Sequence, residues 1–256
     1  MTRGRSNQDQ IFVSLVIPAY NEEKRIKDSL IKIQKYLEQK SYITELIVVD
    51  DGSKDKTLAI ARECLDGMYG YRTLTYEKNR GKGYAVKTGV LDAKGMYIVF
   101  LDADLSTPIE ELDRFLKTLE QGYDIVIGTR KNKEARVEIR QPLFREFLGK
   151  GFTLLSNIFV VKGISDITCG FKGFKREVGR DIFKRLLIDN WSFDAEILFL
   201  SQKLGYKIKE IPVTWYDAEG TKVRLSKDVF GSLKGIFQIQ INSLFKKYKI
   251  KNRRIQ

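Results

Sequence analysis

Two aspartates separated by one residue, Asp102 and Asp104, follow an apolar run at residues 97–101 that has the pattern of a buried strand. Carboxylate oxygens are hard ligands that suit Mg²⁺ or Mn²⁺, and such ions usually share their coordination shell with substrate phosphates. The same spacing is common in surface turns, so its specificity comes from the strand that precedes it. We therefore predict a divalent metal site, for Mg²⁺ or Mn²⁺, at Asp102 and Asp104.

A third carboxylate follows another apolar run, and a lysine opens a later helix. Asp51 comes after the run 46–49 and can accept hydrogen bonds from a nucleotide base or ribose. The alternative is a cap for the next helix, a role that Ser53 could fill instead. Lys82, between two glycines, opens a further helix, where backbone amides and an ammonium group suit a diphosphate. This pattern is shorter than a phosphate-binding loop, and a plain turn remains the alternative.

The elements that must position these side chains alternate between two apolar periods. Strand-like runs occupy residues 11–18, 46–49, 71–76, 96–101, 124–127 and 206–213, and helical patterns occupy 22–39, 54–65, 84–93, 108–120 and 193–204. Such alternation predicts an α/β fold with a mostly parallel sheet flanked by helices. Ligands of these sheets bind beyond the carboxyl ends of the strands, where Asp51, Asp102 and Asp104 all fall.

Composition narrows the chemistry further. The chain has 256 residues, of which 46 are basic and 33 acidic, giving a net charge of +13, and it has no histidine. Imidazole metal sites, Ser-His-Asp triads and histidine general bases are therefore excluded. The positive charge favours acidic partners such as nucleic acid, anionic lipid or phosphorylated substrates. We set nucleic acid aside, because the chain has no recognition motif for it and such binding leaves the clustered acids unexplained.

The cysteines and the amino terminus bear on location. Cys64 and Cys169 are too few for a disulfide framework, which favours a reducing compartment. The first ten residues lack the apolar core of a signal peptide, and no stretch has the length and purity of a membrane-spanning helix. We therefore expect a cytoplasmic protein.

The carboxyl-terminal residues have a pattern of their own. From Val229 onward apolar residues recur every three or four positions, and basic residues follow over 246–254. A basic amphipathic helix of this kind is typical of a helix that lies on an anionic membrane surface. The alternatives are a helix packed on the protein's own core or in a homodimer. We expect a domain with the candidate site over 11–222 and an amphipathic helical extension over 223–256.

Seven short motifs, spread over most of the chain, carry a family resemblance. The first four are SLVIPAYNEE at 14–23, VVDDGSKD at 48–55, NRGKG at 79–83 and LDAD at 101–104. In this order they resemble glycosyltransferase family 2, with its Rossmann-like GT-A fold. The other three are DITCGFK at 166–172, WSFDAE at 191–196 and IPVTW at 211–215. These resemble the dolichyl-phosphate glucosyltransferase branch; the related mannose synthases share the layout but usually differ at the cysteine and the Trp-X-Phe-Asp stretch.

The resemblance implies donor-side roles for individual residues. Those that would hold the nucleotide are Pro18, Ala19, Tyr20, Glu22 and Asp51. Lys82 would lie near the donor. Asp102 and Asp104 would hold the metal together with the ribose and diphosphate of the donor.

On the acceptor side, Arg130 would face the donor or acceptor phosphate, while Arg145 and Lys222 match residues that the family uses for the acceptor. The family's acceptor loop often has a serine four residues after its arginine; here that position is Gly149, which puts one hydroxyl contact in doubt. Asp194 would orient groups on the acceptor side, and a role as general base is the lesser option.

The activity implied by the resemblance is a metal-dependent, inverting transfer of a hexose, with glucose favoured, from a nucleotide sugar to a polyprenyl or dolichyl phosphate. The donor would be UDP-glucose, and the reaction would take place at the cytoplasmic face of the membrane. A phosphate nucleophile is already ionised at neutral pH, which agrees with a chain that has no histidine. The alternatives are a mannose synthase that uses GDP-mannose and a family 2 enzyme with a saccharide acceptor.

Overall fold

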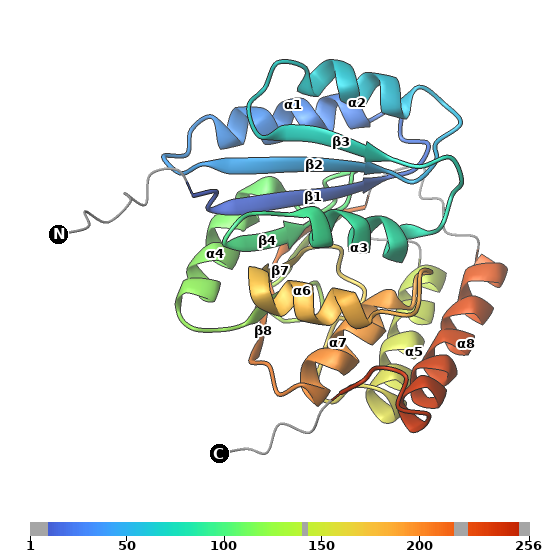
Figure 1. The fold of residues 1–256 in the computed structure, drawn as a ribbon. Helices are drawn as coiled ribbons and strands as arrows, with labels where there is room; N and C mark the ends of the chain where they lie inside the picture. Colours follow the sequence, from blue (N-terminus) through green and yellow to red (C-terminus); the bar gives the residue numbers. More distant parts are fainter. Residues whose placement is uncertain (1–9, 140–142, 218–224, 251–256) are drawn as a thin grey trace.

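The computed structural model describes residues 10–139, 143–217 and 225–250 (Figure 1), with the backbone alone at 143–146, 225–230, 232 and 233. Seven strands of the described residues form one sheet, in the order β3 (Tyr71–Thr75), β2 (Thr44–Asp50), β1 (Val13–Ala19), β4 (Tyr97–Phe100), β7 (Lys172–Lys175), β5 (Ile125–Thr129) and β8 (Ile208–Pro212). All neighbouring pairs are parallel except those of β7, which is antiparallel to both β4 and β5. The predicted mostly parallel sheet is confirmed.

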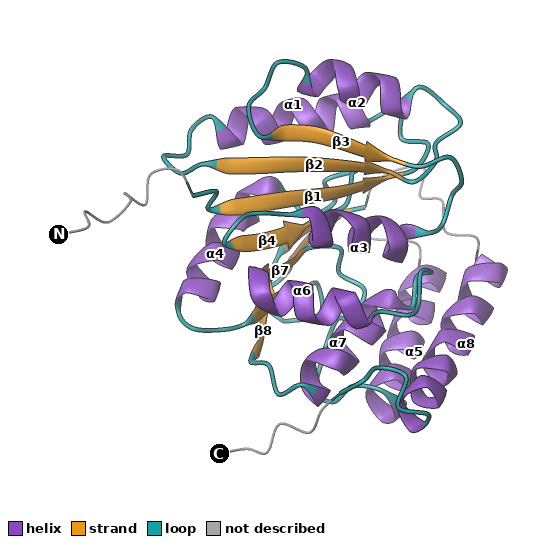
Figure 2. Cartoon of the chain, in the orientation of Figure 1, coloured by secondary structure: helices purple, strands orange, loops and turns teal. Residues whose placement is uncertain are grey.

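Helices cover both faces of this sheet (Figure 2). One face is covered by α1 (Ile26–Leu37), α2 (Thr57–Leu65) and α4 (Leu112–Glu120), which follows a 3₁₀ turn at Ile109–Glu111. The other is covered by α3 (Lys82–Asp92), α6 (Arg176–Arg185) and α7 (Phe193–Lys203). The expected apolar stripe of the first helix, Ile26, Leu30, Ile33 and Leu37, is buried against the sheet. Most of these helices bury one stripe, whereas α7 is buried on all sides over residues 193–201. Two apolar cores result, one on each face of the sheet.

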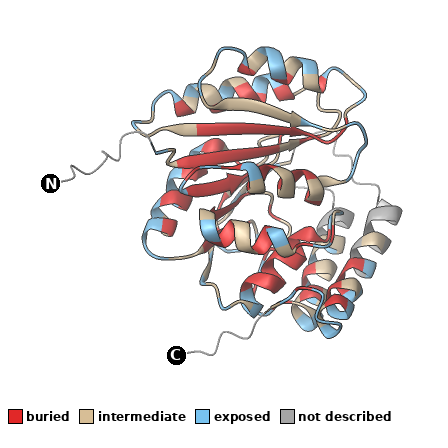
Figure 3. Ribbon diagram, in the orientation of Figure 1, coloured by how far each residue is buried: buried red, intermediate tan, exposed pale blue. Residues whose placement is uncertain are grey.

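The central strands are buried on both faces (Figure 3). Their runs of Val, Ile, Leu and Phe are continuous rather than alternating, as expected for parallel strands that have helices above and below. These strands form a rigid base, and the loops at their carboxyl ends are free to carry polar groups.

Strand β7 was not predicted. Its sequence is Lys-Gly-Phe-Lys, which has no strand period and begins with a lysine. Lys172 is nevertheless fully buried, because its ammonium donates hydrogen bonds to Cys169 O (2.6 Å) and Asp194 Oδ1 (2.5 Å). A partner far away in the sequence thus makes a charged residue acceptable inside the sheet.

Two strands and two helices of the described residues lie outside the main sheet and the helices that cover it. Strands β6 (Arg136–Ile139) and β9 (Thr214–Tyr216) make a small parallel sheet, and helices α5 (Leu143–Phe159) and α8 (Leu225–Leu244) lie side by side (Figure 1). In α8, Ile236 and Ile239 are buried against the domain, and Tyr248 beyond the helix end is buried as well. The expected boundary at 222–223 lies outside the described residues. None of the described helices combines the length and apolar character that a membrane span requires.

Candidate active site

The strands place the expected donor-side residues that follow them at one edge of the sheet. Ala19 at the end of β1 is opposite Asp50 at the end of β2, and Val16 is opposite Phe100 at the end of β4. Strand β5 runs in the same direction as β4, because β7 is antiparallel to both. The residues that follow β2, β4 and β5 therefore meet at the carboxyl edge, where open α/β sheets bind their ligands.

Asp102 and Asp104 each have a cationic neighbour. Lys82 Nζ, at the first residue of α3, lies 2.5 Å from Asp102 Oδ1. Arg25 Nη1 lies 4.0 Å from Asp104 Oδ2, and its guanidinium is also paired with Glu22. The Asp104 carboxylate is further held by a hydrogen bond from Ser106 N to Oδ1 (3.0 Å). The two acids thus share a site with two cations.

The charges of Asp102, Asp104 and Lys82 act on one another in this group. Burial raises the pKa of Asp104 above its ordinary value, and the negative charge of Asp102 raises it further. Burial lowers the pKa of Lys82, but the carboxylates of Asp102 and Asp194 outweigh this effect and the net shift is upward. A divalent cation between Asp102 and Asp104 would relieve the repulsion between them. No cluster of three or more acidic or thiol side chains that could hold a metal occurs in the described residues.

The Asp102 carboxylate rests on the backbone of a distant residue, Gly170. A Cβ atom built on Gly170 would overlap both carboxylate oxygens of Asp102. Only glycine allows this close approach. The motif that surrounds Gly170 therefore has a direct part in the site: it sets where Asp102 can lie. Sequence reasoning noted the motif but did not assign this residue.

Asp51 is held by the loop between β3 and α3. Its carboxylate accepts hydrogen bonds from Tyr76 Oη (2.7 Å), Asn79 Nδ2 (2.8 Å), Arg80 N (2.8 Å) and Gly81 N (3.0 Å). These four donors order the loop that leads into α3. The predicted nucleotide contact of Asp51 stays a prediction, and it would have to share a carboxylate that this loop already uses.

Asp50 is an acid that sequence reasoning missed. It is 2 % exposed, and its Oδ2 accepts hydrogen bonds from Thr75 Oγ1 (3.0 Å) and Ser53 N (3.3 Å). Its Oδ1 is buried with no hydrogen-bond partner among the described residues. Buried carboxylate oxygens are nearly always hydrogen-bonded, so Asp50 is a second candidate for a nucleotide contact. Asp50 and Asp51 are adjacent residues of the same type, so the sequence does not show which of them has a carboxylate oxygen left without a hydrogen bond.

The loop after β1 carries the remaining nucleotide-side residues. Pro18 and Ala19 are the last residues of β1, and Ala19 O accepts the hydrogen bond from Asp51 N (2.8 Å). Tyr20 follows directly, and Glu22 N donates to Thr57 Oγ1 (2.6 Å) at the start of α2. These bonds bring the loop after β1 against the loop after β2, as the nucleotide assignment requires.

Arg130, whose side chain is 19 % exposed, forms an ion pair with the fully buried Asp166 at the end of β5. Its Nε and Nη2 donate hydrogen bonds to the two carboxylate oxygens of Asp166 at 2.7 and 2.9 Å, and Nη2 also donates to Thr168 Oγ1 (2.9 Å). Its guanidinium carbon lies 5.3 Å from the centre of the Trp215 ring. Burial alone would raise the pKa of Asp166, but Arg130 lowers it well below the ordinary range. Asp166 thus fixes the orientation of Arg130.

Asp194 lies deeper than expected for a group that handles substrate. It is 3 % exposed and is paired with Lys172 below the site. Burial raises its pKa, although Lys172 and Lys82 oppose the shift. The neighbouring acid Glu196 accepts hydrogen bonds from Leu187 N, Ile188 N and Tyr248 Oη, so it ties the carboxyl-terminal segment to the loop before α7.

Two expected acceptor residues are not placed. Lys222 lies outside the described residues. Arg145 lies within α5, but its side chain is outside the described part of the structure. Their acceptor roles stay predictions.

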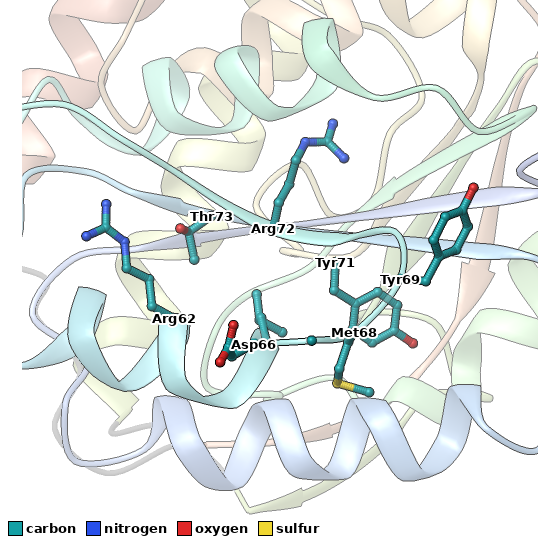
Figure 4. Close-up of a pocket in the computed structure, with 9 residues that line it drawn as sticks. Arg62, Asp66, Met68, Tyr69, Tyr71, Arg72 and Thr73 are labelled. Atoms are coloured by element: carbon teal, nitrogen blue, oxygen red, sulfur yellow. The ribbon is translucent and has the colours of Figure 1, made fainter.

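A surface hollow of about 600 Å³ opens elsewhere, beside the edge strand β3 (Figure 4). It is lined by Arg62, Leu65, Asp66, Gly67, Met68, Tyr69, Tyr71, Arg72 and Thr73. These residues come from the end of α2 and the start of β3, so the hollow is at the amino edge of the sheet. It contains none of the expected site residues and is not part of the candidate site.

Comparison with known proteins decides the family. The model of the family described as Glycosyl transferase family 2 matches residues 14–183. This chain belongs to glycosyl transferase family 2. The match includes Asp51, Asp102 and Arg130, and it also includes Gly170 beneath Asp102.

Curated relatives of this family 2 chain agree on one branch. The dolichyl-phosphate β-glucosyltransferase of Dictyostelium discoideum is 36 % identical, over 95 % of this chain and 78 % of its own length. The human protein of the same name is 38 % identical, over 82 % of this chain and 69 % of its own length. The Saccharomyces cerevisiae protein of the same name is 33 % identical, over 95 % of this chain and 78 % of its own length. The predicted resemblance to this branch, and with it the assignment as a glycosyltransferase, is confirmed.

Solved structures confirm the GT-A fold of this glycosyltransferase. Mannosyl-3-phosphoglycerate synthase from Rubrobacter xylanophilus superposes with a TM-score of 0.69 at 17 % identity, covering 96 % of this chain and 77 % of that one. Glucosyl-3-phosphoglycerate synthase from Mycobacterium tuberculosis, in complex with Mn²⁺, UDP-glucose and phosphoglyceric acid, superposes with a TM-score of 0.64 at 21 % sequence identity. The match covers 95 % of this chain and 82 % of that one.

Proposed function

We propose that this glycosyltransferase moves glucose from UDP-glucose to dolichyl phosphate or a similar polyprenyl phosphate, with inversion at the sugar's anomeric carbon. The observation that carries the proposal is the 33–38 % identity to dolichyl-phosphate β-glucosyltransferases. The Mycobacterium tuberculosis structure with Mn²⁺ and UDP-glucose supports the same donor and a divalent metal.

The chemistry is a single displacement. An oxygen of the acceptor phosphate attacks C1 of glucose, the bond from C1 to the diphosphate oxygen breaks, and its electron pair leaves with UDP. The attacking phosphate is already ionised, so no proton has to be removed and no strong general base is required. A Mg²⁺ or Mn²⁺ ion held by Asp102 and Asp104 would supply positive charge to the departing diphosphate.

Arg130 is suited to the phosphate of the donor or acceptor. Its hydrogen bonds to Asp166 and Thr168 use Nε and Nη2, which leaves Nη1 for a phosphate oxygen as far as the described residues go. A guanidinium that is already oriented loses little entropy on binding, and it stabilises a growing negative charge without rearrangement. Asp194 is better suited to orienting its lysine neighbours than to removing a proton, because it is buried and paired with Lys172.

The exposed faces of α5 and α8 support an anionic membrane surface as the place of reaction. Large apolar side chains are exposed there at helical spacing, namely Phe147, Leu154, Ile158 and Phe159 on α5, and Phe237, Ile241, Leu244 and Phe245 on or just beyond α8. The rings of Phe159 and Phe237 are 6.2 Å apart, so the two sets adjoin. Exposed lysines 234, 246 and 247 and the net charge of +13 complement anionic lipid.

The sequence left open whether the last helix packs on the domain or on a membrane. Ile236, Ile239 and Asn242 pack inward, so the helix packs on its own domain and still exposes an apolar face.

We place the acceptor at the cytoplasmic face of the membrane, which agrees with the unpaired state of Cys64 and Cys169.

The transfer reaction is tested by a donor screen with a short polyprenyl phosphate. UDP-glucose, GDP-mannose and UDP-N-acetylglucosamine are each supplied with Mg²⁺, with Mn²⁺ or with EDTA, and the lipid-linked sugar is measured. We expect glucose transfer that EDTA abolishes. Faster transfer of mannose from GDP-mannose would replace the proposal with the mannose synthase alternative.

The membrane surface is tested by sedimentation with anionic vesicles. The double variant Phe237→Ser/Phe245→Ser should bind at least about tenfold more weakly than the unaltered protein, because about 1.5–3 kcal/mol of apolar burial is lost for each side chain. Tyr69→Ser is the matched control, since Tyr69 is 90 % exposed at the hollow beside β3. Equal binding of both variants, or self-association through this face without lipid, would remove the membrane assignment.

A further inference from the structure

Lys82 stands where a cation is expected. Its Nζ lies 2.5 Å from Asp102 Oδ1, and its side chain is 16 % exposed. The backbone of Gly170 lies against the same Asp102 carboxylate, where a Cβ atom would overlap both oxygens, so the room for Asp102 to move is limited. The ammonium of Lys82 thus forms an ion pair with one of the two carboxylates that are assigned to the metal.

This ion pair affects how a metal can bind. Asp102 paired with Lys82 has little net charge to offer a divalent ion, and a lysine ammonium next to that ion would repel it. Metal binding therefore requires the ammonium to leave Asp102. Lys82 has another acid nearby, since the charge of Asp194 also raises the pKa of Lys82. The diphosphate of a bound nucleotide would offer it a third partner.

We propose that Lys82 is an exchangeable counter-ion that keeps the metal from Asp102 until a nucleotide diphosphate draws the lysine away. The inference rests on the proposed function for the identity of the metal and the nucleotide. It adds that the protein without nucleotide has a weak metal site. It also predicts that metal and nucleotide each strengthen the binding of the other, beyond the direct contact between them.

The position of Lys82 suits this exchange. It is the first residue of α3, so its backbone is fixed by the helix while its long side chain can swing. Its Nζ is also 5.2 Å from the centre of the Trp191 ring, which lies at the rim of the site and is 40 % exposed. The ammonium can therefore move from Asp102 toward solvent-facing phosphates without crossing the apolar core.

The test measures Mn²⁺ binding rather than activity. Free Mn²⁺ is followed by electron paramagnetic resonance during titration of the full chain, first without and then with UDP. In Lys82→Met, Mn²⁺ should bind without UDP about tenfold more tightly than in the unaltered protein, and UDP should enhance Mn²⁺ binding less. Lys82→Gln tests the same loss of charge with a polar side chain, in case the methionine variant does not fold.

Lys78→Met is the matched control. Lys78 is exposed in the loop before α3, and the substitution removes the same charge. Its Mn²⁺ affinity should stay within about twofold of the unaltered protein, because exposed charges are screened. Unchanged or weaker Mn²⁺ binding in both Lys82 variants would overturn the counter-ion proposal while leaving glucose transfer intact as a proposal. Mn²⁺ binding by none of the proteins, even with UDP, would overturn this inference and the metal dependence together.

Discussion

The first half of the sheet and the segment from Asp166 onward contribute to the same site in different ways. After β1, β2 and β4, polar residues lie at strand ends and are held by loops close to them, as Asp51 is by the loop before α3. In the later segment, charges are buried in ion pairs between distant residues, such as Arg130 with Asp166 and Lys172 with Asp194. The first half presents the groups that would touch the donor, and the later segment fixes where they point.

This difference predicts two kinds of mutational effect. Substitutions at the strand ends should reduce transfer and spare the fold. Substitutions in the later segment should reduce stability, or reduce transfer through a residue that they do not themselves replace. The four predictions below test this division, first through the rate of transfer and then through stability, with the larger expected effect first in each case.

Asp102→Asn should reduce the rate of glucose transfer by about a thousandfold, because the site loses a negative ligand beside the departing diphosphate. Thermal unfolding should change little, since the substitution removes the ion pair with Lys82 but also relieves repulsion from Asp104. Asp113→Asn, at an exposed acid on α4, is the control. A rate within about threefold of the unaltered enzyme would show that Asp102 is not part of the chemistry.

Gly170→Ala should reduce transfer by about a hundredfold without changing any charge, because the new methyl group forces the Asp102 carboxylate aside. Gly151→Ala is the matched control, since a Cβ atom on Gly151 meets nothing within 4 Å. Steady-state rates of both variants, measured with a Mn²⁺ titration, give the answer. Equal rates would mean that the later segment does not position the strand-end acids.

Asp166→Asn should lower the free energy of unfolding at pH 7 by about 3–5 kcal/mol, because it leaves the largely buried guanidinium of Arg130 with a neutral partner. The folded pKa of Asp166 lies below the ordinary 3.8, so its contribution is present above that pH and is lost as the pH falls below it. Urea unfolding at pH 7 and pH 3 should therefore show a smaller pH effect in the variant. In the exposed control Asp113→Asn the change should be below about 0.5 kcal/mol; a similar small change in Asp166→Asn would contradict the buried-pair interpretation.

Gly235→Ala should lower the free energy of unfolding by about 1–3 kcal/mol, because its Cβ would overlap the side chain of Ser192 at the start of α7. Gly231→Ala lies one turn earlier in α8 and meets nothing within 4 Å, so it should raise stability by about 0.5–1 kcal/mol through helix propensity alone. Thermal unfolding of the pair measures how tightly α8 is docked. Equal changes in both variants would mean that α8 is only loosely attached.

Sequence reasoning located most strands and helices of the first half, because there each element has its own apolar period and each strand end has its own polar residue. It predicted that Asp51, Asp102 and Asp104 lie at one edge of the sheet for the same reason. It missed β7, whose lysines and glycine are acceptable in a buried strand only because Lys172 reaches Asp194. It also left open whether the last helix packs on the domain or on a membrane, and α8 has a buried side and an exposed apolar side.

The amino-acid sequence alone determined the kind of fold, the family and the chemical types at the strand ends, since these depend on local period and on motifs. Only the tertiary structure decided which residues contact those groups and fix their positions. Gly170 beneath Asp102, Asp166 against Arg130 and Lys82 on Asp102 each join residues that are far apart in the chain. Such contacts depend on how strands and helices pack, and that packing cannot be predicted from a local pattern of residues.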